Sequence, residues 1–255
     1  MSLDAKCAIV TGASRGIGRA IALRLAREGA SVMATARDQD ALDGLVRETG
    51  GRAAAVALDL RQPGASGRLV EAALAAFGEI DIVVNNAGAT RRGEFEQLSD
   101  EDWTDGFALK FFGAVRLTRA AWPHLKRRSG SVVNIAGVGG RTPGAEFAVG
   151  GSVNAALLSF TKALADAGIR DGVQVNAINP GPVRTGRLAR RLAARASETG
   201  ASLDEAARDF IREAGITRIG EPDDIAGLVA FVVSPAGRLL QGALIDMDGG
   251  QTKTI

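Results

Sequence analysis

Short apolar runs alternate with segments of helical spacing along the chain. Apolar and β-branched residues concentrate in seven runs, at residues 7–12, 31–36, 53–60, 80–86, 130–136, 173–180 and 243–248. Between them, apolar residues recur with helical spacing over 17–30, 65–77, 103–125, 154–167 and 222–233. The first pattern predicts strands, and the second predicts amphipathic helices.

The order of these elements predicts the fold class. Strands that alternate with helices form parallel sheets, because each helix returns the chain to the end of the sheet at which the previous strand began. The runs are almost continuously apolar, as in strands covered on both faces. No linker, repeat or low-complexity tract interrupts the pattern. We therefore predict one doubly wound α/β domain over residues 1–255.

Composition and charge narrow the class of protein. The 255 residues are 46% hydrophobic, and their net charge of +2 comes from interleaved acids and bases. This balance argues against nucleic-acid binding. No apolar leader and no run of membrane-spanning length is apparent, so we expect a cytoplasmic protein that binds no membrane. The single cysteine, Cys7, excludes a disulfide framework and a metal site built on several thiolates. The single histidine, His124, argues against a zinc site.

A glycine-rich turn joins the first predicted strand to the first predicted helix. Its glycines, Gly12, Gly16 and Gly18, allow a sharp turn and close approach of the backbone to a phosphate. The helix that opens near Ile17 would present its N-terminus to that phosphate. Glycine is common in ordinary turns, but the position between a strand and an amphipathic helix favours a dinucleotide-binding loop.

With "NNAG" at 85–88, the spacing Gly12-x-x-x-Gly16-x-Gly18 resembles the short-chain dehydrogenase/reductase family. The resemblance covers the whole chain, through "LDL" at 58–60, "NPGPVRT" at 179–185 and "DGG" at 248–250. It implies a single Rossmann-type parallel sheet of about seven strands with helices on both faces. The cofactor-binding residues that it implies are Gly12, Ser14, Arg15, Gly16, Ile17, Gly18, Arg37, Asp59, Leu60, Asn86, Ala87, Gly88, Pro180, Gly181, Val183 and Thr185.

The residues after the second predicted strand bear on cofactor choice. An NAD-preferring relative places an acid there to bind the ribose 2′-hydroxyl, but this chain has Ala36 and then Arg37. Arg15 lies in the glycine loop, and two guanidiniums suit a 2′-phosphate. The nearby carboxylate of Asp38 would repel a 2′-phosphate to some extent. The alternative is that both arginines are ordinary surface residues. We favour NADP(H) over NAD(H).

The catalytic positions depart from the family pattern. Similar proteins carry an Asn, a Ser and a Tyr-x-x-x-Lys motif. Here Lys110 falls at the asparagine, Gly137 at the serine, Gly150 at the tyrosine and Asn154 at the lysine. The chain contains no tyrosine, and a shifted register would bring Phe147 to the tyrosine position. The resemblance therefore predicts a divergent site without the usual proton donor.

A lysine–asparagine exchange is the main candidate for replacement chemistry. Lys110 could reach the vacated place near Asn154 from the facing helix, and a buried lysine can act as a general acid. The alternative is a lysine on a helix surface at a subunit interface. Ser152 is a further candidate donor, although serine is a poor acid without a partnered base.

Residues 186–217 correspond to the segment that forms a substrate lid in similar proteins. Arg187, Arg191 and Arg195 share one face of its predicted helix. This basic face would suit an acidic or carrier-linked substrate, and a solvated amphipathic helix is the alternative.

Three functions remain open at this point. The first is an NADP(H)-dependent oxidoreductase acting on a secondary alcohol or ketone, and we place it ahead of the others. The second is a non-redox lyase or isomerase, and the third is a catalytically silent NADP-binding protein or partner subunit. Apolar residues on more than one helix face, including Phe107, Phe111 and Phe112, predict a homodimer or homotetramer.

Overall fold

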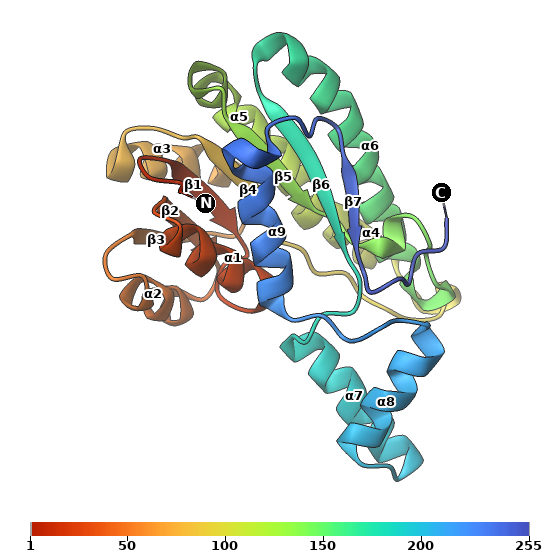
Figure 1. The fold of residues 1–255 in the computed structure, drawn as a ribbon. Helices are drawn as coiled ribbons and strands as arrows, with labels where there is room; N and C mark the ends of the chain where they lie inside the picture. The colour runs from red at the N-terminus through yellow and green to blue at the C-terminus, as the bar shows by residue number, and fades with distance from the viewer. Residues whose placement is uncertain (1, 255) are drawn as a thin grey trace.

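A computed structural model describes residues 2–254, which form a sheet of seven parallel strands (Figure 1). The strand order is β3-β2-β1-β4-β5-β6-β7. The strands are β1 Cys7–Thr11, β2 Ser31–Ala36, β3 Ala53–Ala57, β4 Ile82–Asn85, β5 Ser131–Ile135, β6 Gln174–Pro180 and β7 Leu244–Met247. Each lies within one of the seven predicted runs. The prediction of a doubly wound parallel sheet of about seven strands is confirmed.

Helices cover both faces of this sheet. One face carries α1 Gly16–Arg27, α2 Gln39–Glu48 and α9 Pro222–Val233, and the other carries α3 Ala65–Phe77, α5 Gly113–Arg128 and α6 Ala148–Asp171. Side chains alternate across a strand, so Ala8 and Val10 of β1 enter the first core while Ile9 enters the second. Two buried faces explain why the strands read as continuous apolar runs.

The helix predicted at 103–125 is divided into three parts. α4 covers Asp100–Gly106, a π-helical turn covers Phe107–Phe112, and α5 begins at Gly113. Such π-turns insert an extra residue and often occur at functional sites. Lys110 lies in the π-turn, so this irregularity helps to set the direction of its side chain.

The prediction that no run reaches membrane-spanning length is wrong for one helix. By length and composition alone, Ala145–Asp171 is apolar enough to cross a membrane. However, Leu157 and Leu158 of this helix pack with Ala136 and Ala177 beside the sheet. Burial inside the domain accounts for part of its apolar composition, since 44% of the apolar window is buried.

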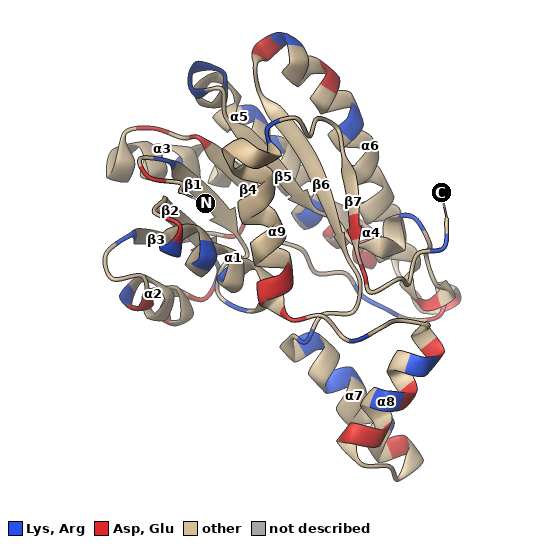
Figure 2. Cartoon of the chain, viewed as in Figure 1, with Lys and Arg blue, Asp and Glu red and all other residues tan. Residues whose placement is uncertain are grey.

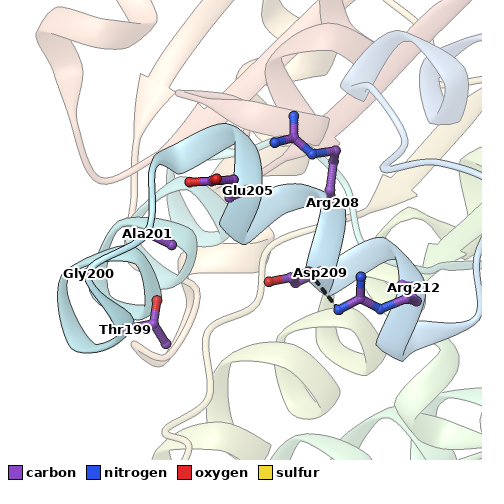
Figure 3. A pocket seen from close by; sticks show the side chains of 7 residues that line it. All are labelled: Thr199, Gly200, Ala201, Glu205, Arg208, Asp209 and Arg212. Carbon is purple, nitrogen blue, oxygen red and sulfur yellow. Dashed lines mark hydrogen bonds and ion pairs between the residues drawn. The ribbon is translucent and has the colours of Figure 1, made fainter.

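Two helices extend beyond the sheet, α7 Gly186–Thr199 and α8 Leu203–Ala214 (Figure 1). They hold each other through a small apolar cluster that includes Leu188, Leu192 and Ile216. A surface depression between them is lined by Thr199, Gly200, Ala201, Glu205, Arg208, Asp209 and Arg212 (Figure 3). It contains none of the predicted site residues.

Candidate active site

The glycine loop is packed so closely that side chains would not fit. Gly12 and Gly16 have positive φ angles of 66° and 56°. A Cβ atom added at Gly18 would lie 2.3 Å from the Gly12 carbonyl oxygen. α1 begins directly after this loop, with no side-chain cap from Arg15 and no acid in its first turn. Its first N–H groups therefore suit an anion, and the loop fits a dinucleotide pyrophosphate.

Asn86, directly after β4, holds this loop in place. Its Nδ2 donates to the carbonyl oxygen of Thr11 at 2.9 Å and to that of Gly12 at 3.4 Å. The backbone N–H groups of Asn86 and Ala87 donate to Thr11 Oγ1, both at 2.9 Å. The amide side chain of Asn86 thus positions the loop. Ser14 lies in this loop, and Ile17 lies in the first turn of α1.

Arg37 lies exposed directly after β2 and makes no ion pair with any residue from 2 to 254. The neighbouring Asp38 carboxylate accepts a hydrogen bond from Ala41 N at 3.1 Å and caps α2. Asp38 therefore has a structural use that leaves Arg37 free to bind an anion. Asp59 lies two residues after β3, and its carboxylate accepts a hydrogen bond from Arg61 N at 3.0 Å.

The segment after β6 returns to the glycine loop. Gly181 N donates to Met247 O at 3.1 Å, which ties the segment to β7. A Cβ atom built at Gly16 would lie 3.2 Å from Thr185 Cγ2. The structure therefore brings the end of the segment that contains Pro180, Gly181, Val183 and Thr185 beside the loop.

Lys110 and Asn154 contact each other directly. The ammonium nitrogen of Lys110 donates to Asn154 Oδ1 and to the Ala136 carbonyl oxygen, each at 2.5 Å. Its aliphatic stem lies where a side chain on Gly88 would otherwise stand, since a Cβ there would be 2.8 Å from Lys110 Cδ. Burial, followed by the positive charge of Arg187, lowers the pKa of Lys110 from 10.5 to about 7.

Two glycines adjoin this pair. Gly137 has a φ of +131°, and a Cβ atom there would lie 3.1 Å from Asn154 Nδ2. A Cβ atom at Gly150 would lie 2.1 Å from two ring carbons of Phe147. The Phe147 ring therefore fills the space into which a side chain at position 150 would project.

Ser152 does not join this group. It lies exposed on α6, whereas Asn154 is 2% exposed. Residues two apart on a helix point in different directions, so the sequence-based hypothesis that Ser152 donates a proton here finds no geometric support. Among residues 2–254, no group of three or more His, Cys, Asp or Glu side chains could hold a metal ion.

The three arginines predicted to share a face of α7 have different partners. Arg187 Nη2 donates to the Gly88 carbonyl oxygen at 3.1 Å, so it reaches the site. Arg191 lies over the Phe210 ring, and Arg195 pairs with Glu213 at 2.6 Å. Both partners belong to α8, so Arg191 and Arg195 hold α7 against α8.

Sequence reasoning missed Arg92, which reaches the site from the loop after β4. Its guanidinium carbon lies 4.2 Å from the centroid of the Phe147 ring. Arg92 and Phe147 are 55 positions apart in the sequence, and no motif links them. Only the folded chain brings them together.

Known proteins resemble this chain over nearly its whole length. The sequence profile of a family described as enoyl-(acyl carrier protein) reductase matches residues 12–252. An uncharacterised oxidoreductase of Mycobacterium tuberculosis is 39% identical over 98% of this chain and 93% of its own.

Two solved structures are also similar. L-sorbose reductase from Gluconobacter frateurii, complexed with NADPH and L-sorbose, has a TM-score of 0.94 at 31% identity, over 100% of this chain and 99% of that one. The 3-ketoacyl-(acyl-carrier-protein) reductase from Brucella melitensis, complexed with NADH, has a TM-score of 0.86 at 30% identity, over 98% and 99%. Structures of this shape thus hold nicotinamide cofactors of both types.

Proposed function

This chain belongs to the short-chain dehydrogenase/reductase family, and we propose that it is an NADP(H)-dependent oxidoreductase acting on a secondary alcohol or ketone. In this proposal, Lys110 and Asn154 replace the family's usual proton-handling residues. One observation carries it: the Lys110 amine is held between Asn154 Oδ1 and the Ala136 carbonyl oxygen, beside Gly137.

A nicotinamide cofactor, when bound by the glycine loop, would supply or accept the hydride at the substrate carbon. The Lys110 ammonium gives a proton to the carbonyl oxygen during reduction, and the neutral amine takes a proton from the alcohol during oxidation. A pKa of about 7 suits both directions, because both protonation states are populated near neutral pH. The two acceptor oxygens hold the amine in place.

The preference for NADP(H) rests on the charges at the adenine end. Arg15 and Arg37 are exposed there without ion-pair partners among the described residues, and the Asp38 carboxylate caps α2. Two free guanidiniums suit the 2′-phosphate that distinguishes NADP(H) from NAD(H).

Three further expectations belong to this proposal. Residues 186–217 would form a lid, since α7 and α8 extend beyond the sheet and Arg187 reaches Gly88. The aromatic cluster formed by Phe107, Phe111 and Phe112 of the π-turn and Phe160 of α6 would pair copies into a homodimer or homotetramer. The enzyme would act in the cytoplasm on a small-molecule substrate, without nucleic acid or membrane partners.

A comparison of Lys110→Met with Lys162→Met tests the proposal. Lys162 is exposed on α6, so its loss should leave turnover unchanged. Lys110→Met should lower the rate of ketone reduction by about a hundredfold or more, because a general acid contributes at least that much. NADPH absorbance during turnover on a panel of ketones is the measurement. Equal rates in the two variants would remove Lys110 from the chemistry.

A second candidate is an NADP(H)-binding protein without turnover. The Phe147 ring beside Gly150 favours it, because that ring takes up space next to the proposed reaction centre. Fluorescence titration that shows NADPH binding, with no turnover on any ketone or alcohol of the panel, would support this candidate over the first.

A further inference from the structure

We propose that the substrate carries a carboxylate, and that Arg92 and Arg187 bind it on either side of the site. This inference rests on the proposed function, because it assigns a substrate class to the same site. It follows from where the two guanidiniums lie and from the partners that they lack.

Arg92 is fixed in place but has no anionic partner. Its guanidinium stacks on the Phe147 ring at 4.2 Å, and that ring borders Gly150 of the site. Stacking engages the face of the guanidinium and leaves the N–H donors on its edge available. No residue from 2 to 254 accepts a hydrogen bond from this side chain or forms an ion pair with it. A free, oriented edge of this kind suits a carboxylate.

Arg187 approaches from the lid. One of its nitrogens, Nη2, donates to the Gly88 carbonyl oxygen, and Gly88 lies against the stem of Lys110. Within the described chain, Arg187 also has no carboxylate partner. Its charge is close enough to Lys110 to lower the pKa of that amine. An anion bound at Arg187 would therefore lie near the proposed proton donor.

Positive charge at this position is poorly neutralised. Burial and the charges of Arg191 and Arg187 lower the pKa of Arg92, and Glu146 alone opposes the shift. Burial, Arg15 and Arg190 lower the pKa of Arg187. In both cases other guanidiniums oppose the charge of the arginine, so an anion bound beside them would be stabilised.

Two other arginines of the same region are paired with carboxylates. Arg184, just before α7, lies 2.8 Å from Glu221, and Arg195 lies 2.6 Å from Glu213. Figure 2 shows that α7 and α8 carry both basic and acidic positions. By contrast, no carboxylate among residues 2–254 forms an ion pair with Arg92 or Arg187. Cofactor phosphates could engage Arg187 through its proximity to Arg15. Because Arg92 is stacked beside Gly150, its substitution distinguishes an effect on substrate binding from an effect on cofactor binding.

Calorimetry on the complex with NADP⁺ tests this inference without turnover, because the oxidised cofactor cannot reduce a ketone. The probes are pyruvate, acetoacetate and levulinate, each compared with its methyl ester. At least one acid should bind about tenfold or more tightly than its ester. Arg92→Gln should remove that preference and leave the affinity for NADP⁺ unchanged. Arg91→Gln, at the neighbouring position paired with Asp102, should behave as the unmodified protein does.

Several outcomes would overturn the inference. These are a series in which no acid binds more tightly than its ester, an unchanged preference in Arg92→Gln, or equal losses in both arginine variants. Turnover is measured separately with NADPH. Preferential binding of an acid without its reduction would support the carboxylate site and contradict the oxidoreductase proposal, so the two failures are distinguishable.

Discussion

The ring of Phe147 occupies the place where a side chain on Gly150 would stand. A Cβ atom at Gly150 would lie 2.1 Å from the ring, well inside any real contact, and Gly150 itself is buried. The two positions are therefore coupled: a large residue at 150 requires a smaller one at 147. This coupling determines whether a tyrosine can be accommodated at position 150.

The variant Lys110→Asn/Gly150→Tyr/Asn154→Lys should be destabilised and should gain no ketone reduction, because the new tyrosine would clash with Phe147. Adding Phe147→Ala should remove the clash and raise turnover by about a hundredfold or more, the usual contribution of a general acid. Lys110 is replaced in both variants because a lysine at 154 would otherwise face a second ammonium. The measurements are melting temperature and NADPH consumption.

Since the two variants differ only at position 147, their comparison isolates the ring. Equal melting temperatures and equal rates would show that Phe147 moves aside easily. The coupling to Gly150 would then be too weak to influence activity.

The depressed pKa of Lys110 predicts how stability changes with pH. Below pH 7 the amine is protonated in both the folded and the unfolded chain, so the folded state carries the full cost of a buried charge. Between about pH 7 and pH 10.5, the folded chain releases the proton while the unfolded chain retains it, and stability rises with pH. The melting temperature of the native protein, relative to that of Lys110→Met, should therefore increase over this window.

The same scan on Lys162→Met serves as the control, because the exposed side chain of Lys162 has no comparable environment. Lys162→Met thus controls for the loss of one lysine from an exposed position of α6. A difference for Lys110→Met that stays constant with pH would mean that the Lys110 amine is hydrated in the folded protein.

How far the sequence predicts this protein depends on the range of the interactions involved. The seven strands follow from local hydrophobic runs, and the glycine loop follows from backbone requirements that only a few residues meet. The contact between Lys110 and Asn154 could be anticipated because an exchange at two matched positions suggests proximity. It is the one part of the candidate catalytic group that the sequence and the structure share.

The remaining features depend on packing between distant segments. Stacking of Arg92 on Phe147 joins a loop to a helix start and leaves no periodic trace in the sequence. Ser152 is near Asn154 in sequence, yet the turn of α6 places it on the exposed face. The π-turn at Phe107–Phe112 is likewise invisible to an analysis based on helical spacing.

Cofactor choice is tested at Arg37. Arg37→Ala should weaken binding of NADPH by about tenfold to a hundredfold, because it removes a charge-assisted contact, and should leave binding of NADH nearly unchanged. Arg119→Ala, an exposed arginine of α5 away from the glycine loop, is the control. Fluorescence titration with both cofactors gives the affinities. Tighter binding of NADH than of NADPH by the native protein would contradict the preference for NADP(H).

The aromatic cluster of the π-turn and α6 predicts the oligomeric state. Phe111 makes edge contacts with Phe107, Phe112 and Phe160 at centroid distances of 5.3 to 6.1 Å, and Phe112 remains 45% exposed. An exposed ring at the edge of such a cluster suits a contact with a second copy of the chain. We therefore expect a homodimer or homotetramer, and Phe112→Glu should shift it toward smaller species by placing a charge in that contact. Phe95→Glu, at a ring that is 69% exposed outside the cluster, should leave the assembly intact. Light scattering at micromolar concentration distinguishes these cases, and a monomeric native protein would refute the prediction.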